Sequence, residues 1–281
     1  STQALNIMVA CGQIFIAFGL TSLAGGLGSQ LLSMDRYNSL VQLALQTALG
    51  LGILSIGFLF IGTVIGVKPV LMWAIFLLLG FFFKNAVWNW YRTIWKALSL
   101  CRPDSRLGIA IAVGVGIILF STLMVGLAPP LKFDTLVYHL ALPRIYLQEG
   151  RMQYIPWLFY WGMPQITEML YTWALSLAGE GAAIVFGWLI GLIALLGLYG
   201  YVKQLIGSKA AWVAIGSLLA GFTTAASLAW GYVSWMSILY GLTFLVSIDT
   251  WVLTSDIRYL ILTGVFAGLA LGVKYTNGIL L

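Results

Sequence analysis

The chain has 281 residues, of which 61% are hydrophobic and only 8% charged, and its formal net charge is +6. This balance excludes a soluble globular domain and is typical of a polytopic α-helical membrane protein, because the apolar runs are about twenty residues or longer and do not alternate as barrel strands do. The cations lie in short connections, so the charge does not indicate nucleic-acid binding. The two cysteines, Cys11 and Cys101, predict neither a disulfide nor a metal site.

Apolar segments recur along the whole chain and predict about eight membrane-spanning helices. The third segment begins at Pro69, a residue favoured in the first turn of a helix, and is short unless it continues through Trp88 and Trp90. The segments lie near residues 5–32, 40–67, 69–83, 107–128, 182–202, 210–230, 235–253 and 259 to the end. A helix rising 1.5 Å per residue needs about twenty residues to cross a hydrocarbon core of about 30 Å.

The distribution of cations predicts the orientation. Residues 84–106 carry several cations and a single acidic residue, Asp104, so we expect this segment to be cytoplasmic and the loop at residues 129–168 to lie outside. We divide the chain into residues 1–106, which hold additional transmembrane helices and the cytoplasmic basic loop, and a core at residues 107–281. The cations of the basic loop are Lys84, Arg92, Lys96, Arg102 and Arg106.

The loop at residues 129–168 contains the only histidine of the sequence, His139, and several charged residues. A membrane protein that gathers its scarce ionisable groups in one place is expected to use them there. Residues 134–148 have helical character, with a bend expected at Pro143 and a stop at Gly150. The sequence thus predicts an all-α, polytopic transmembrane helical bundle with two juxtamembrane amphipathic helices in a long outer loop.

The second of these helices is expected at residues 164–178, along the outer surface of the protein. Its apolar residues form one stripe, and a polar stripe contains Gln165, Glu168, Thr172 and Ser176. Glu168 is then expected to face a cavity or water. In the alternative interpretation the helix forms a shallow hairpin with the next span, and Glu168 is only solvated.

Asp134 follows the end of a predicted span by a few residues, so the span fixes how far Asp134 lies from the membrane. A carboxylate at this place is suited to act as a general base on a substrate carried by a lipid. It is equally suited to cap the helix that follows, because Asp is a favoured N-cap residue. The local sequence does not decide between the two interpretations.

The loop reads FDTLVYHLALPRIYL, then a Gly, an aromatic-rich stretch and MPQITEMLY, and the chain ends with LTGVFAGLALGVKYTNGILL. In this order and spacing, residues 107–281 resemble the GT-C class of membrane glycosyltransferases, most closely the bacterial family 39 and RgtA/B/C/D-like group. Relatives in that group extend further, so we expect this chain to be a fragment. Ser234 stands where the pattern of the group has Asp.

The resemblance implies an integral, multi-pass protein of the bacterial inner membrane that works on the cell envelope. It would move a sugar, by an inverting mechanism, from a polyprenyl-phosphate donor to a glycan, lipid or protein acceptor on the outer face. Asp134 would be the base and Glu168 a second acidic residue that orients the acceptor or helps to hold a divalent metal. No organic cofactor is expected. The candidate substrate-binding residues are Lys274, for the donor phosphate, with Tyr138, His139, Arg144 and Tyr275.

Two other classes of protein remain open. A transporter or flippase of a lipid-linked or small polar substrate would place charged residues along its path, and Asp249 is the main acidic candidate inside a span. No inverted repeat is evident, which weakens this alternative. A non-catalytic scaffold would leave the polar residues of the outer loop without a role.

Overall fold

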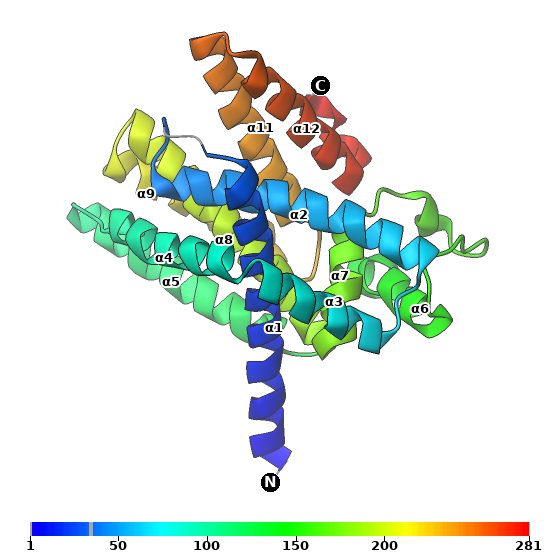
Figure 1. The fold of residues 1–281 in the computed structure, drawn as a ribbon. Helices are drawn as coiled ribbons and strands as arrows, with labels where there is room; N and C mark the ends of the chain where they lie inside the picture. The colour runs from blue at the N-terminus through cyan, green and yellow to red at the C-terminus, as the bar shows by residue number, and fades with distance from the viewer. Residues whose placement is uncertain (1, 34–35, 281) are drawn as a thin grey trace.

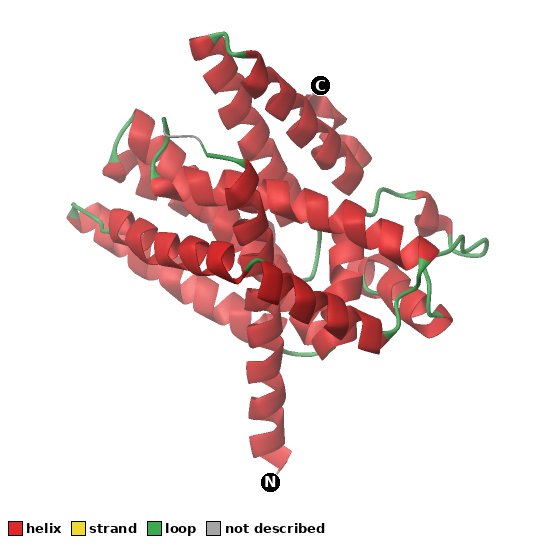
Figure 2. Ribbon diagram, viewed as in Figure 1, coloured by secondary structure: helices red, strands yellow, loops and turns green. Residues whose placement is uncertain are grey.

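The computed structural model describes residues 2–33 and 36–280, which fold into helices and connecting loops without a β-strand (Figures 1 and 2). The all-α prediction is therefore confirmed for this part of the chain. The α-helices are α1 (Thr2–Leu31), α2 (Ser39–Val64), α3 (Pro69–Phe82), α4 (Lys84–Leu98), α5 (Arg106–Gly126), α6 (Ala141–Glu149), α7 (Ile166–Ala178), α8 (Glu180–Leu205), α9 (Ser208–Ala220), α10 (Phe222–Ala226), α11 (Ser234–Thr254) and α12 (Ile257–Val273).

Five of the described helices, α1, α2, α5, α8 and α11, are long and apolar enough to cross a membrane. Two further predicted spans are broken: the axis bends by 75° between α3 and α4, and by 88° between α9 and the short helical segment that follows it. Helix α12 is apolar but shorter than the five long helices. The expectation of about eight spans is therefore corrected to five candidate spans among the described residues, or up to seven if each bent pair counts as one span.

Helix α8 lies at the centre of the bundle and packs against α1, α2, α7, α9 and α11 (Figure 1). Gly187 and Gly191 on α8 leave no room for a Cβ atom against Tyr171 and Leu228, so the chain packs closely at these glycines. On α12, by contrast, Gly264 and Gly268 have no heavy atom of the described residues near the position of a Cβ, so these two glycines make no such close contact.

The two ends of α2 separate the connections that the sequence predicts to be cytoplasmic from the outer loop. Near its first residue, Gln204 donates a hydrogen bond of 2.9 Å to the carbonyl oxygen of Arg36, and Lys203 donates to Leu100. Beyond its last turn, the amide of Val67 donates to the carbonyl oxygen of Gly150 at 2.8 Å. The basic connections at residues 36, 100 and 203 thus lie at one end of α2 and the outer loop at the other.

The first part of the outer loop is a short π-helix (Thr135–His139) followed by α6. Gly150 ends α6 in the left-handed conformation with φ of 71°, as predicted for a C-terminal stop. The interruption falls at Leu140 rather than at the predicted Pro143. Pro143 lies in the first turn of α6, where its missing N–H breaks no helical hydrogen bond.

Helix α7 covers almost the range that the sequence predicts, but its surroundings differ from the predicted outer surface. It is enclosed by α2, α6 and α8 and most of its residues are buried, so it does not lie along the outer surface. The polar stripe consequently faces protein: Thr172 is fully buried and donates to the carbonyl oxygen of Glu168 at 2.7 Å. Glu168 is 1% exposed, so the interpretation in which it is only solvated is wrong.

Candidate functional site

A cavity of about 200 Å³ lies where the outer loop meets the end of α12. Three segments that are distant in the sequence form it: the π-helix, the beginning of α7 with the residues before it, and the residues after α12. Five of the seven residues that the sequence predicts for the site line this cavity. The lining residues are Tyr138, His139, Met163, Pro164, Glu168, Val273, Lys274, Tyr275 and Thr276.

His139 and Glu168 form a buried pair in the wall of the cavity. Nδ1 of His139 lies 2.6 Å from Oε1 of Glu168, and each residue is 1% exposed. When Glu168 is ionised, its carboxylate can only accept, and Nδ1 then carries the hydrogen and donates it. The second polar atoms, Nε2 of His139 and Oε2 of Glu168, are buried and have no hydrogen-bond partner within the described residues.

The π-helix positions His139. The amide of Leu140 donates to the carbonyl oxygen of Thr135 at 2.9 Å, five residues earlier, which is the hydrogen bond of a π-turn. The hydroxyl of Thr135 also donates to the carbonyl oxygen of Trp230, which ties this turn to the segment before α11. Single π-turns of this kind are frequent at functional sites.

Tyr138 lies between the two acidic candidates. Its ring stacks on Tyr160 at a centroid distance of 4.8 Å and lies 3.9 Å from the ring of His139. Burial raises the pKa of the Tyr138 hydroxyl well above its usual value, and the charges of Asp134 and Glu168 raise it further. Tyr138 therefore stays neutral at physiological pH and remains a hydrogen-bond donor.

Asp134 precedes the π-helix, is partly exposed and does not line the cavity itself. Its side chain accepts no capping hydrogen bond, so the structure gives the capping interpretation no support. It adjoins the cavity through Tyr138, and it also lies close to Tyr232, the pKa of which is raised by burial and then by the charge of Asp134. The carboxylate is thus free to accept a proton from a bound group.

Arg144 is the predicted binding residue that the structure does not bring to the cavity. Its Nε donates a hydrogen bond of 2.6 Å to Oε1 of Glu180, and the two side chains form an ion pair that is about one-third exposed. Glu180 is the first residue of α8, where a carboxylate also interacts favourably with the helix dipole. The sequence prediction did not include Glu180, although its place after Gly179 fits a helix start.

Lys274 and Tyr275 follow the last turn of α12, and the backbone of Lys274 is extended. This end of α12 meets the outer loop, because Lys274 and Glu168 line the same cavity. Among the described residues, acidic side chains lie within ion-pair distance of His139, Arg144 and Arg258 but not of Lys274. The ammonium group is therefore available to an anionic ligand.

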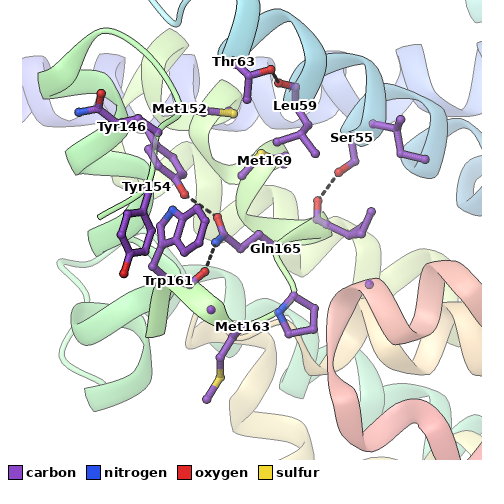
Figure 3. Close-up of a pocket in the computed structure, with 16 residues that line it drawn as sticks. Ser55, Leu59, Thr63, Tyr146, Met152, Tyr154, Trp161, Met163, Gln165 and Met169 are labelled. Atoms are coloured by element: carbon purple, nitrogen blue, oxygen red, sulfur yellow. Dashed lines mark hydrogen bonds between the residues drawn. The ribbon is translucent and has the colours of Figure 1, made fainter. Parts of the chain in front are cut away.

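A second cavity of about 570 Å³ is shown in Figure 3. It adjoins the first, because Met163 and Pro164 line both. Its polar side chains mostly bond to the protein itself: Tyr146 donates to Gln165 at 2.8 Å, and Gln165 donates to the carbonyl oxygen of Trp161 at 2.7 Å (Figure 3). Burial raises the pKa of Tyr146 to about 12, which keeps this hydroxyl a donor. The walls that remain are largely apolar.

The sequence did not predict this larger cavity. Its walls come from α2, the outer loop, α7 and Gly272 of α12, and no local pattern joins these segments. The described residues contain no group of three or more His, Cys, Asp or Glu side chains that could hold a metal ion. Within the part of the chain that the structure describes, Glu168 has one neighbour of this kind at hydrogen-bonding distance, His139.

Comparisons of the chain with protein-family models, with curated proteins and with solved structures found no match.

Proposed function

We propose that this protein is a membrane glycosyltransferase that moves a sugar from a polyprenyl-phosphate donor to a hydroxyl or amine of an acceptor on the outer face of the membrane. One observation carries the proposal: a small cavity lined by Lys274, which forms no ion pair within the described residues, lies beside a larger apolar cavity, and Met163 and Pro164 line both. A ligand with an anionic head and a long apolar chain is complementary to this pair of cavities.

In the proposed complex, the polyprenyl chain occupies the larger cavity and the phosphate lies beside Lys274. Lysine binds phosphate as a compact positive charge with three donors. The acceptor approaches from the side of Asp134, since this residue adjoins the cavity through Tyr138. A carrier lipid is physically sensible on this face of the membrane, because cytosolic nucleotide sugars do not reach it.

The transfer is a single displacement with inversion. Asp134 accepts the proton of the acceptor hydroxyl as its oxygen forms a bond to the anomeric carbon. The bond between that carbon and the phosphate oxygen breaks at the same time, and the electron pair leaves with the polyprenyl phosphate. Lys274 stabilises the negative charge that grows on the leaving phosphate.

The experiment is a transfer assay with the protein purified into lipid nanodiscs. Undecaprenyl phosphates carrying radiolabelled mannose, glucose or galactose are supplied together with an extract of envelope glycans and lipids as acceptor. We expect label to move from the donor to the extract with at least one sugar, and Asp134→Asn protein to be inactive. Mass spectrometry of envelope glycans from cells with and without the intact gene identifies the product. Transfer by neither the purified protein nor the cells would refute the proposal.

A further inference from the structure

Two buried polar atoms beside the small cavity lack a hydrogen-bond partner within the described residues: Nε2 of His139 and Oε2 of Glu168. Both residues line the cavity, and both are 1% exposed. Buried polar atoms in folded proteins are nearly always hydrogen-bonded, so such a pair needs an explanation. A ligand in the cavity can supply the missing partners, as an ordered water would in its absence.

The chemistry of the pair defines what the ligand must offer. With Glu168 ionised and His139 neutral, the carboxylate accepts the hydrogen of Nδ1, and Nε2 of the imidazole is then an acceptor. Oε2 of the carboxylate is also an acceptor. Two unsatisfied acceptors in one wall require two hydrogen-bond donors, which hydroxyl or ammonium groups supply.

The other walls of the cavity favour hydroxyl groups. Lys274 lines the same space, and its charge repels an ammonium ligand while attracting a phosphate. Tyr138 and Tyr275 present aromatic rings, against which the C–H groups of a sugar pack well. At about 200 Å³, the cavity suits one sugar ring rather than an oligosaccharide.

We propose that His139 and Glu168 select the transferred sugar, with Nε2 and Oε2 accepting hydrogen bonds from two of its hydroxyl groups. The proposal rests on the proposed function for the identity of the donor, with its phosphate beside Lys274. Glu168 also holds His139 in the tautomer that accepts. A site built to pair with a hydroxyl rejects the analogue that lacks it, because its own buried groups are then left unpaired.

The test measures binding rather than transfer, so it does not depend on the acceptor. Undecaprenyl phosphates carrying mannose, glucose or galactose are titrated into nanodisc-embedded protein, and the tightest binder is compared with its 2-, 3-, 4- and 6-deoxy forms and with undecaprenyl phosphate alone. For the wild type we expect one or two of the deoxy forms to bind about tenfold more weakly or worse. Equal binding of all these ligands would overturn the proposal.

Variants of His139 and Glu168 then test whether these two residues cause the preference among the deoxy forms. In Glu168→Gln, the amide oxygen can still accept from Nδ1 of His139, and the amide nitrogen turns the free acceptor into a donor. We expect the preference for one hydroxyl to fall to about threefold or less, and His139→Gln to abolish the preference for the other. Thr167→Val is the matched control, because Thr167 is a buried polar neighbour on α7 that does not line the cavity. It should keep the wild-type pattern.

The outcomes separate this proposal from the proposed function. Sugar-dependent binding that requires Glu168, without any transfer, would support the sugar site and refute the transferase. Active transfer with an unchanged preference in Glu168→Gln would refute the role of the pair and leave the transferase in place. If Glu168→Gln instead lost transfer with every sugar equally and kept the binding preferences of the wild type, the role of the pair in sugar selection would also be refuted. The pair would then take part in proton transfer.

Discussion

The hydroxyl of Tyr275 donates a hydrogen bond of 2.6 Å to the carbonyl oxygen of Gly162, 113 residues earlier in the chain. This contact joins the end of α12 to the outer loop at the place where the two cavities meet. Gly162 lines the larger cavity and Tyr275 the smaller. The residue before Tyr275 is Lys274, so the hydrogen bond also holds the backbone beside the proposed phosphate-binding cation.

Asp134→Asn is expected to abolish transfer without affecting folding. The substitution keeps the shape of the side chain but removes the proton acceptor, and general bases typically contribute about 10²–10⁴-fold. The side chain of Asp134 makes no capping hydrogen bond, so we expect normal expression and a thermal unfolding temperature close to that of the wild type. Transfer at a rate near that of the wild type would show that another group accepts the proton.

The orientation of the chain is tested with a matched pair of single cysteines. In a variant without Cys11 and Cys101, Arg151→Cys places a thiol on the exposed outer loop and Arg102→Cys places one in the basic loop. We expect an impermeant thiol reagent to label the first in intact cells and the second only after lysis, because the cationic loop should be cytoplasmic. The reverse pattern would place the cavities on the cytoplasmic side and remove the argument for a lipid-linked donor.

The sequence predicted the helical class and most of the residues at the small cavity, because both depend on local signals. The length of the apolar segments indicated the spans, and the gathering of scarce ionisable residues in the loop pointed to Glu168 and His139, whereas Lys274 was implied by the resemblance. The burial of α7 was missed, since amphipathic patterning alone does not tell whether the polar stripe meets water or another helix. The larger cavity and the partner of Arg144 depend on contacts between distant segments, which no local pattern contains.

Arg144 and Glu180 should contribute little to stability and nothing to donor binding. Their ion pair is about one-third exposed, and exposed pairs are typically worth about 0.2–1 kcal/mol. We therefore expect Arg144→Met and Glu180→Gln, combined in a double-mutant cycle of chemical unfolding, to show a coupling of about 1 kcal/mol or less. The donor KM should stay within about twofold of the wild type in both single variants, since neither residue lines a cavity. A large rise in donor KM for Arg144→Met alone would restore Arg144 as a binding residue.

Lys274→Met should weaken donor binding and leave membrane insertion intact. Methionine has a similar length but no charge, and a hydrogen bond to a charged group is typically worth about 1.5–3 kcal/mol, which corresponds to an increase in donor KM of about tenfold to hundredfold. Lys274→Arg should retain part of the activity, because the positive charge remains while its shape changes.

The control is Lys68→Met, which removes an exposed lysine just before α3, at the end of the bundle where α2 meets the outer loop. If both variants leave donor KM unchanged, Lys274 does not bind the phosphate and its side chain only extends towards the lipid headgroups. If both raise it equally, the effect is one of general surface charge, and high salt should then reduce the difference from the wild type. A rise confined to Lys274→Met, with binding of the donor and of undecaprenyl phosphate alone weakened alike, is the result that places the phosphate at this residue.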